Sequence, residues 1–131
     1  MKGSCLCGTI GYEVDSIDKP IGHCHCRTCR KAHAAAFNTA CGVLREHFRW
    51  LRGSERLSSF ESSPGKLRYF CSVCGSHLIA ERAGQPHVVL RVATLDDDPG
   101  LAPVHHIWVS HKVPWLEYDG MPMYSEWQPG R

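Results

Sequence analysis

Eight cysteines in a chain of 131 residues are the feature that most constrains how this sequence can fold. Seven of them form three tight groups: Cys5 and Cys7; Cys24, Cys26 and Cys29; Cys71 and Cys74. Disulfide frameworks spread their cysteines to join distant loops, whereas C-x-C and C-x-x-C pairs aim two thiolates at one point. The spacing therefore predicts metal binding. Zinc is the metal most typical of such short knuckles, ahead of an iron–sulfur cluster.

The number of clustered cysteines suggests how two zinc ions would share them. A closed structural zinc site takes four ligands, which the first and third groups supply together. The middle group, Cys24, Cys26 and Cys29, then supplies three, and three protein ligands with one free position are typical of a reactive zinc. An alternative adds Cys41 or His23 as a fourth ligand. Both sites would then be closed and the zinc purely structural.

Two glycines support the prediction of zinc knuckles. Gly8 follows Cys7 and Gly75 follows Cys74. A chain that folds back around a metal often needs a positive φ at this point, which glycine adopts without steric cost. We therefore expect both pairs to sit in tight metal-binding turns.

Composition bounds the class of protein. A length of 131 residues predicts one domain, 1–131. The formal charge of +2, without a basic stripe, gives no strong attraction to nucleic acid or membrane surfaces. No apolar run approaches the ~20 residues of a membrane span, and the first residues lack the apolar core of a secretory signal. We therefore expect a cytoplasmic protein whose cysteines stay reduced.

The remaining sequence predicts many short strands separated by turns. We expect strands over residues 9–14, 37–43, 48–52, 57–60, 67–70, 78–82, 88–93 and 106–109. One short helix is expected over 30–36, because alanine has the highest helix propensity. No alternation of strands and helices is visible, so we expect a mainly β fold of antiparallel strands, at most one or two short helices and no parallel sheet. Prolines predict an irregular tail from about residue 112.

The order of the motifs resembles the glutathione-dependent formaldehyde-activating enzyme family, which also includes centromere protein V. The resemblance rests on Cys-x-Cys-Gly at residues 5–8, Cys-His-Cys-x-x-Cys-Arg at 24–30 and Phe-Cys-x-x-Cys-Gly at 70–75. It continues through residues 94–97, 106–109 and 112–115 and spans residues 3 to about 124. A single knuckle would be weak evidence, but this order of three is specific.

The resemblance implies a fold, a ligand set and an activity. The fold would be an Mss4-like β domain with two zinc positions. Cys5, Cys7, Cys71 and Cys74 would hold a structural zinc, and Cys24, Cys26 and Cys29 a catalytic zinc, in agreement with the count above. The activity would combine glutathione with formaldehyde to give S-hydroxymethylglutathione, formally a carbon–sulfur lyase reaction in reverse. The motifs do not encode which thiol or aldehyde is used.

Thiol chemistry suits a zinc ion held by three thiolates. The formal charge of 2 − 3 = −1 makes it a poor generator of hydroxide but a good partner for a soft sulfur, so we expect it to bind a substrate thiol and lower its pKa. Arg27, Arg30 and Lys31 flank the cluster and are candidates to hold the carboxylates of a thiol such as glutathione, or to form a solvated basic face. His25 and His33 are candidate proton carriers, although a supporting or surface role is the default for each.

Other features have simpler interpretations. Cys41 is expected to be a small buried side chain. The run from Asp96 to Asp98 is expected to be a solvated loop. The aromatic residues near the C-terminus are expected to cover the core, the less favoured alternatives being a substrate pocket or contact with a second chain: Trp108, Trp115, Tyr118, Tyr124 and Trp127. The competing function is a non-catalytic, zinc-stabilised module that binds another protein.

Overall fold

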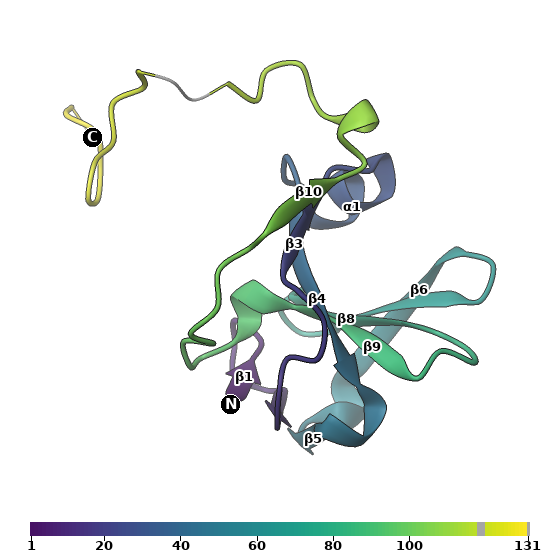
Figure 1. The fold of residues 1–131 in the computed structure, drawn as a ribbon. Helices are drawn as coiled ribbons and strands as arrows, with labels where there is room; N and C mark the ends of the chain where they lie inside the picture. Colours follow the sequence, from purple (N-terminus) through teal and green to yellow (C-terminus); the bar gives the residue numbers. More distant parts are fainter. Residues whose placement is uncertain (118–119, 131) are drawn as a thin grey trace.

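Ten short strands and one α-helix make up the computed structural model, which describes residues 1–117 and 120–130 (Figure 1). The strands are β1 Lys2–Ser4, β2 Gly11–Val14, β3 Gly22–Cys24, β4 Asn38–Leu44, β5 Phe48–Arg52, β6 Leu57–Ser63, β7 Lys66–Cys71, β8 His77–Arg82, β9 His87–Arg91 and β10 His105–Ile107. The helix is α1 Arg27–His33, and four 3-10 turns are η1 Arg45–His47, η2 Ser54–Arg56, η3 Val92–Thr94 and η4 Val109–His111. The prediction of a mainly β fold is confirmed.

The strands form two sheets. A three-stranded sheet has the order β1-β2-β5, and a seven-stranded sheet has the order β10-β3-β4-β9-β8-β7-β6. All pairs are antiparallel except β10 with β3, which is parallel. The expectation of no parallel pairing is therefore wrong at this edge. Strand β10 follows a long connection from β9 rather than a hairpin, so its direction is not tied to that of a neighbour.

The predicted strands agree with the observed ones in every case, and two further strands were not predicted. The eight expected ranges coincide with β2 and with β4 to β10. Strands β1 and β3 have three residues each, too short to show an alternating pattern. The helix begins at Arg27 and ends at His33, three residues earlier than expected at each end.

The core is built mainly from residues of the strands of both sheets. Ile10, Val43, Leu78 and Leu90 are fully buried there. Tyr12 is the largest buried side chain, and its hydroxyl pairs with the hydroxyl of Thr94 at 2.8 Å. Burial of this kind provides most of the stability of a small domain. Cys41 belongs to the same core, as expected for a small apolar side chain.

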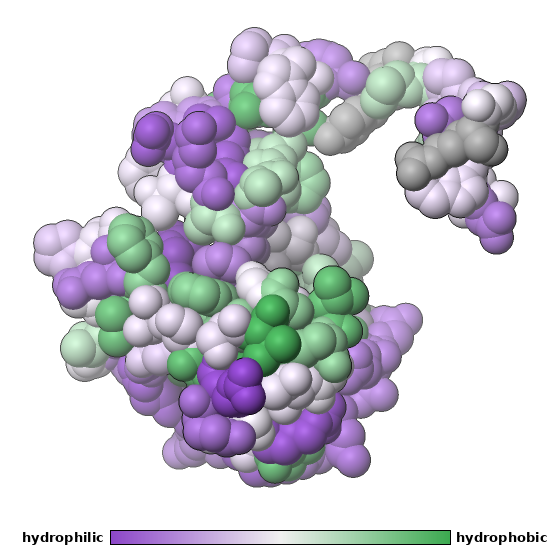
Figure 2. Space-filling model, turned by 180° about the vertical axis from the view of Figure 1, so that it is seen from behind, coloured by the Kyte–Doolittle hydropathy of each residue, from purple (hydrophilic) through white to green (hydrophobic). Residues whose placement is uncertain are grey.

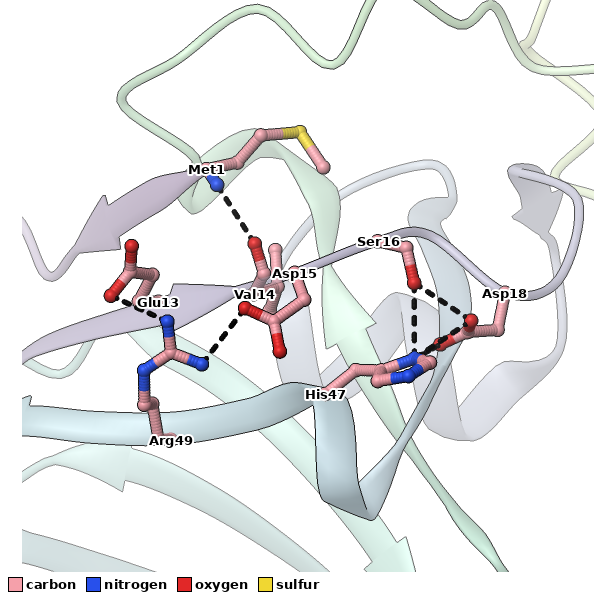
Figure 3. Close-up of polar contacts among 8 residues, drawn as sticks. All are labelled: Met1, Glu13, Val14, Asp15, Ser16, Asp18, His47 and Arg49. Atoms are coloured by element: carbon pink, nitrogen blue, oxygen red, sulfur yellow. Dashed lines mark hydrogen bonds and ion pairs between the residues drawn. The ribbon is translucent and has the colours of Figure 1, made fainter.

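Ionic contacts tie the edge of the smaller sheet together (Figure 3). Arg49 on β5 reaches across to two carboxylates, Glu13 at 2.8 Å and Asp15 at 2.9 Å. The N-terminal ammonium of Met1 donates to the carbonyl of Val14 at 2.8 Å. These contacts fix the start of the chain, and with it the loop that carries the first two cysteines.

A second group of polar contacts lies where β5 begins. Nδ1 of His47 is 3.0 Å from Oδ1 of Asp18, and the hydroxyl of Ser16 lies against both side chains (Figure 3). The other carboxylate oxygen of Asp18 accepts a hydrogen bond from the N–H of Leu44 at 2.8 Å. Asp18 therefore joins the loop after β2 to the end of β4.

The end of the chain forms an arm over residues 112–117 and 120–130, without regular structure in the part that is described. Its start packs on the body, where Val113 and Leu116 are buried, and its outer part leads away from the sheets in Figure 1 and stands clear of the body in Figure 2. The expected aromatic cover of the core is wrong here. Trp108, Trp115, Tyr124 and Trp127 are all more than half exposed, and Tyr118 lies outside the described residues. In the described chain, no helix has the length and apolar character that a membrane crossing requires.

Candidate metal centres and the cavity beside them

The first and third cysteine groups come together as one cluster of four sulfurs. The loop between β1 and β2 supplies Cys5 and Cys7, and the end of β7 and the turn after it supply Cys71 and Cys74. All four Sγ atoms lie within 4.8 Å of one another, with 3.6 Å between those of Cys5 and Cys7. Four convergent thiols are the donor set of a closed tetrahedral zinc site.

The backbone around this cluster has the geometry of a zinc knuckle. Gly8 has φ +78 and Gly75 has φ +79, so both occupy the left-handed region as predicted. The N–H of Ile10 donates to the sulfur of Cys5 at 3.3 Å, and the N–H of Val73 donates to the sulfur of Cys71 at 3.4 Å. Such N–H groups stabilise the thiolate form that a metal requires.

The acidity of these thiols depends on their surroundings. Hydrogen bonds from Ser76, first through its hydroxyl and then through its backbone, lower the pKa of Cys74 to about 5. Hydrogen bonding to Thr9 lowers the pKa of Cys7, while burial raises the pKa of Cys5. The local hydrogen bonds therefore favour the thiolate form of Cys7 and Cys74, while burial disfavours that of Cys5.

The middle group forms a second cluster, of three sulfurs. Cys24 ends β3, and Cys26 and Cys29 lie at the start of α1. Their three Sγ atoms also lie within 4.8 Å of one another. Cys26 caps the helix, because its sulfur accepts a hydrogen bond from the N–H of Cys29 at 3.3 Å. This cap explains why the helix starts earlier than the alanine-rich stretch predicts.

A buried arginine lies against the second cluster. Nη2 of Arg68 donates to the sulfur of Cys29 at a distance of 3.9 Å. Burial raises the pKa of Cys24 to about 12. Burial also acts to raise the pKa of Cys26, but the hydrogen bond from Cys29, further sulfur contacts and the charge of Arg68 lower it overall. The cluster therefore contains both a thiol that favours its proton and one that releases it easily.

The fourth ligands considered from the sequence lie elsewhere. Among the described residues, no fourth Cys, His, Asp or Glu joins the three sulfurs within the same 4.8 Å. Cys41 belongs to the apolar core. His23 precedes Cys24 on an extended strand, so its side chain lies on the opposite face of the sheet and pairs with Thr39 at 2.9 Å. The geometry favours the three-ligand arrangement over the closed one.

The candidate histidines His25 and His33 have partners other than the three sulfurs. His25 is 1% exposed, and its Nε2 lies 2.8 Å from Nδ1 of His106 on β10. It faces a cavity lined by Phe37 and His106, to which none of the three cysteines contributes. His33 packs against His77 with ring centres 4.8 Å apart, and burial lowers its pKa to about 3. Neither side chain borders the cavities that contain the cluster sulfurs.

One face of the large sheet carries a cavity of about 260 Å³ next to the second cluster. The strand register explains which residues form the floor of this cavity. Gly22 pairs with Ala40 and Ala40 pairs with Arg91, so all three residues lie on one face of the sheet. The small side chains leave the space open. A Cβ at Gly22 would lie 2.4 Å from the ring of His105, which also borders the cavity.

Three cationic side chains converge on this cavity, and sequence reasoning missed all of them. Arg68 and Lys66 alternate along β7, and Arg91 ends β9. They line the cavity together with Cys24 and Cys29. The only sequence signal for this cavity was that residues 68 and 91 are charged although they lie inside predicted apolar strands. It does not reveal which face of the sheet the side chain occupies.

The basic residues predicted from the sequence lie on the outer side of the cluster. Arg27 and Lys31 are exposed on α1 and line a cavity of about 440 Å³ with Phe60 and Phe70. Arg27 also lines a cavity of about 310 Å³ with Cys26 and His111. Arg30 is half-buried and is not among the residues lining these cavities. The structure thus brings Arg27, but not Arg30, beside a cavity that reaches a cluster sulfur.

A comparison with protein families connects this arrangement to known proteins. The model of the family described as glutathione-dependent formaldehyde-activating enzyme matches residues 1–111. The chain belongs to the glutathione-dependent formaldehyde-activating enzyme family. The match includes both cysteine clusters and the cavity residues, and it stops where the C-terminal arm begins.

A solved structure has a similar fold to this family member. The crystal structure of a Rhodobacter sphaeroides protein aligns with a TM-score of 0.66 at 26% sequence identity, over 81% of this chain and 99% of the other. A search among curated proteins found no match. Family membership therefore establishes the fold and the setting of the cysteines.

Proposed function

We propose that this protein forms and cleaves the carbon–sulfur bond of a thiol–aldehyde adduct. The reaction would be that of glutathione with formaldehyde to give S-hydroxymethylglutathione, or that of a related pair. The observation that supports it is a cluster of three sulfurs, without a fourth Cys, His, Asp or Glu among the described residues, beside a cationic cavity. Membership of the family agrees with this activity.

The proposal gives the two clusters different tasks. Cys5, Cys7, Cys71 and Cys74 would hold a structural zinc, since four thiolates complete its coordination. Cys24, Cys26 and Cys29 would hold a reactive zinc. When bound there, zinc supplies a soft Lewis acid that lowers the pKa of a substrate thiol.

The chemistry itself is an addition. The thiol sulfur forms a bond to the carbonyl carbon, the C=O π bond breaks, and the proton lost by the thiol ends on the carbonyl oxygen. In reverse, the carbon–sulfur bond breaks and the carbonyl re-forms. No oxidant or reductant is needed.

Several side chains would support the addition by their charge. Arg68 contacts the sulfur of Cys29 and stabilises negative charge on the cluster. On the outer side, Arg27 and Lys31 line the open cavity and would attract the carboxylates of glutathione. Arg30 would add to this positive field from further away.

Metal analysis before and after mild chelation tests the proposal first. We expect two zinc ions per chain, one of which is removed quickly, because the three-sulfur site leaves one coordination position to solvent. Cys26→Ser should lose only the labile zinc, whereas Cys41→Ala, a cysteine outside both clusters, should retain two.

Adduct formation from ¹³C-formaldehyde and glutathione, followed by NMR line shapes, tests the chemistry. The zinc-loaded protein should accelerate exchange between free and adduct carbon, and Cys26→Ser should abolish this effect. If two chelation-resistant zinc ions are found and no exchange is accelerated, the protein-binding module is the better explanation.

A further inference from the structure

The cavity on the sheet face contains buried hydrogen-bond donors that the proposed reaction with formaldehyde does not use. Arg68 and Arg91 are each 4% exposed. Nη1 of Arg68 and both Nε and Nη2 of Arg91 are buried without a hydrogen-bond partner among the described residues. A buried N–H without a partner costs free energy, and a charged one costs more. Two such side chains in one cavity point to a missing acceptor.

No carboxylate of the described chain serves as that acceptor. The residues that line the cavity include no aspartate or glutamate. The ion pairs found in residues 1–117 and 120–130 involve neither arginine, nor Lys66, which borders the same space. Buried charges in proteins are normally paired or bound to an ion. The partner must therefore come from outside this chain or from the cluster.

The charge of the cluster alone does not balance the positive charge of the cavity side chains. Three cysteine thiolates, one zinc ion and one substrate thiolate sum to 2 − 4 = −2. Lys66, Arg68 and Arg91 contribute +3, which leaves one positive charge. A single carboxylate would neutralise it. Its oxygens would accept hydrogen bonds from the unpaired N–H groups of both arginines, and guanidinium groups form such charge-assisted hydrogen bonds readily.

The position and size of the cavity restrict the molecule that carries this carboxylate. Cys24, Cys29 and both arginines line the same space, and Arg68 lies 3.9 Å from the Cys29 sulfur. The carboxylate would therefore lie only a few bonds from the reacting sulfur. At about 260 Å³ the cavity is below the range of about 300–1,000 Å³ that is typical of drug-sized ligands. A small molecule fits it better than a tripeptide.

We propose that this cavity is a carboxylate subsite, and that the thiol substrate is a small mercapto acid whose carboxylate lies two or three carbons from sulfur. The inference rests on the proposed function, since it places the substrate sulfur at Cys24, Cys26 and Cys29. It differs from the outer site at Arg27 and Lys31 in using the buried Arg91 on β9, whereas Arg68 on β7 borders both cavities.

Calorimetry with two matched thiols tests the subsite directly. The probes are 3-mercaptopropionate and the neutral 3-mercapto-1-propanol, each titrated into the zinc-loaded protein. We expect the acid to bind at least about tenfold more tightly, as charge-assisted hydrogen bonds require. Arg91→Met should bring the acid to the affinity of the alcohol and leave the alcohol unchanged. Arg56→Met, the same substitution at an exposed arginine, should change neither.

The outcomes separate this inference from the proposed function. Equal affinity of the wild-type protein for both thiols overturns the subsite, and it does so without relying on any variant. Equal weakening of both thiols by Arg91→Met would show that the arginine only balances the cluster charge, which also overturns it. If adduct formation with glutathione is accelerated in either case, the proposed function stands. If neither thiol binds and no adduct forms, both fail together.

Discussion

Arg68 on strand β7 and Cys29 on helix α1 are in contact across the second cluster, with 3.9 Å between Nη2 and Sγ. They are 39 residues apart in the sequence, and the contact joins strand β7, next to one edge of the large sheet, to the cysteine knuckle. A guanidinium beside a thiolate favours the charged form of the sulfur. The sheet therefore influences how well the cluster binds a metal.

The Arg68 contact leads to a prediction about metal affinity. Arg68→Met should weaken zinc binding at the three-sulfur cluster by about 10–100-fold, the usual effect of losing a partner of a metal ligand. Competition with a chromogenic chelator measures this affinity. Arg56→Met is the control and should retain wild-type affinity, and unchanged affinity in Arg68→Met would contradict a role for the contact.

The two clusters should differ in their effect on stability. Structural zinc binding is worth about 10–16 kcal/mol in small metal-dependent domains, while a whole domain is stable by only about 5–15 kcal/mol. Cys74→Ser should therefore leave the chain largely unfolded, as far-UV circular dichroism and thermal melting would show. Cys26→Ser should fold, with one zinc fewer. A folded Cys74→Ser variant with normal melting would argue against a structural role for the first cluster.

Glycine 75 allows the knuckle geometry to be tested apart from packing. No atom lies within 4 Å of a Cβ placed at Gly75, so Gly75→Ala introduces only backbone strain at φ +79. This strain is expected to cost about 1–2 kcal/mol. Gly84→Ala is a matched control, since Gly84 has φ +81 and equally open space. Urea unfolding should show a similar loss of unfolding free energy for both variants. Only Gly75→Ala should also speed the release of zinc.

The contact between His47 and Asp18 predicts that the stability of the fold depends on pH. The hydrogen bond with Asp18 raises the pKa of His47, so its contribution is complete below the unfolded value of about 6.5 and is lost as pH rises through the folded value. The hydrogen bond from Leu44 is the main cause that lowers the pKa of Asp18, with His47 adding to it. That contribution is lost as pH falls through the lowered folded value.

The stability difference between wild type and His47→Ala should therefore be largest between about pH 4 and 6.5 and should shrink on both sides. Urea midpoints measured across this range provide the test. His111→Ala, at an exposed histidine, is the control and should give a difference that does not follow this profile. A flat difference for His47→Ala would show that the ion pair contributes nothing.

Much of the fold could be predicted because strand patterns and cysteine spacing are local. Strands such as β5 and β8 were placed correctly from apolar and β-branched runs. The helix was misplaced because propensity favoured the alanines, whereas the cap at Cys26 sets its start and Ala34, at φ 48, sets its end. Here the contacts of the knuckle outweigh a propensity worth tenths of a kcal/mol per residue.

The cationic cavity could not be predicted, because it depends on register between distant strands. Arg91 reaches the face of Cys24 through pairing of β9 with β4 and of β4 with β3. A shift of one residue in either pairing would place its side chain on the opposite face. The histidines next to the cysteines lie away from the sulfurs for a related reason, since neighbours in an extended strand point to opposite faces. This agrees with the supporting role expected for His25.

The two clusters also differ in what they do to the unfolded chain. Cys7 and Cys71 are 64 residues apart, so a metal that joins them closes a loop that contains most of the sheet strands. By the entropy of closing such a loop, a covalent link there would be worth about 4 kcal/mol. The second cluster draws its ligands from six consecutive positions, 24 to 29, and closes almost no loop. Loss of metal would thus open this long loop at the first cluster, whereas at the second it would free only six neighbouring positions.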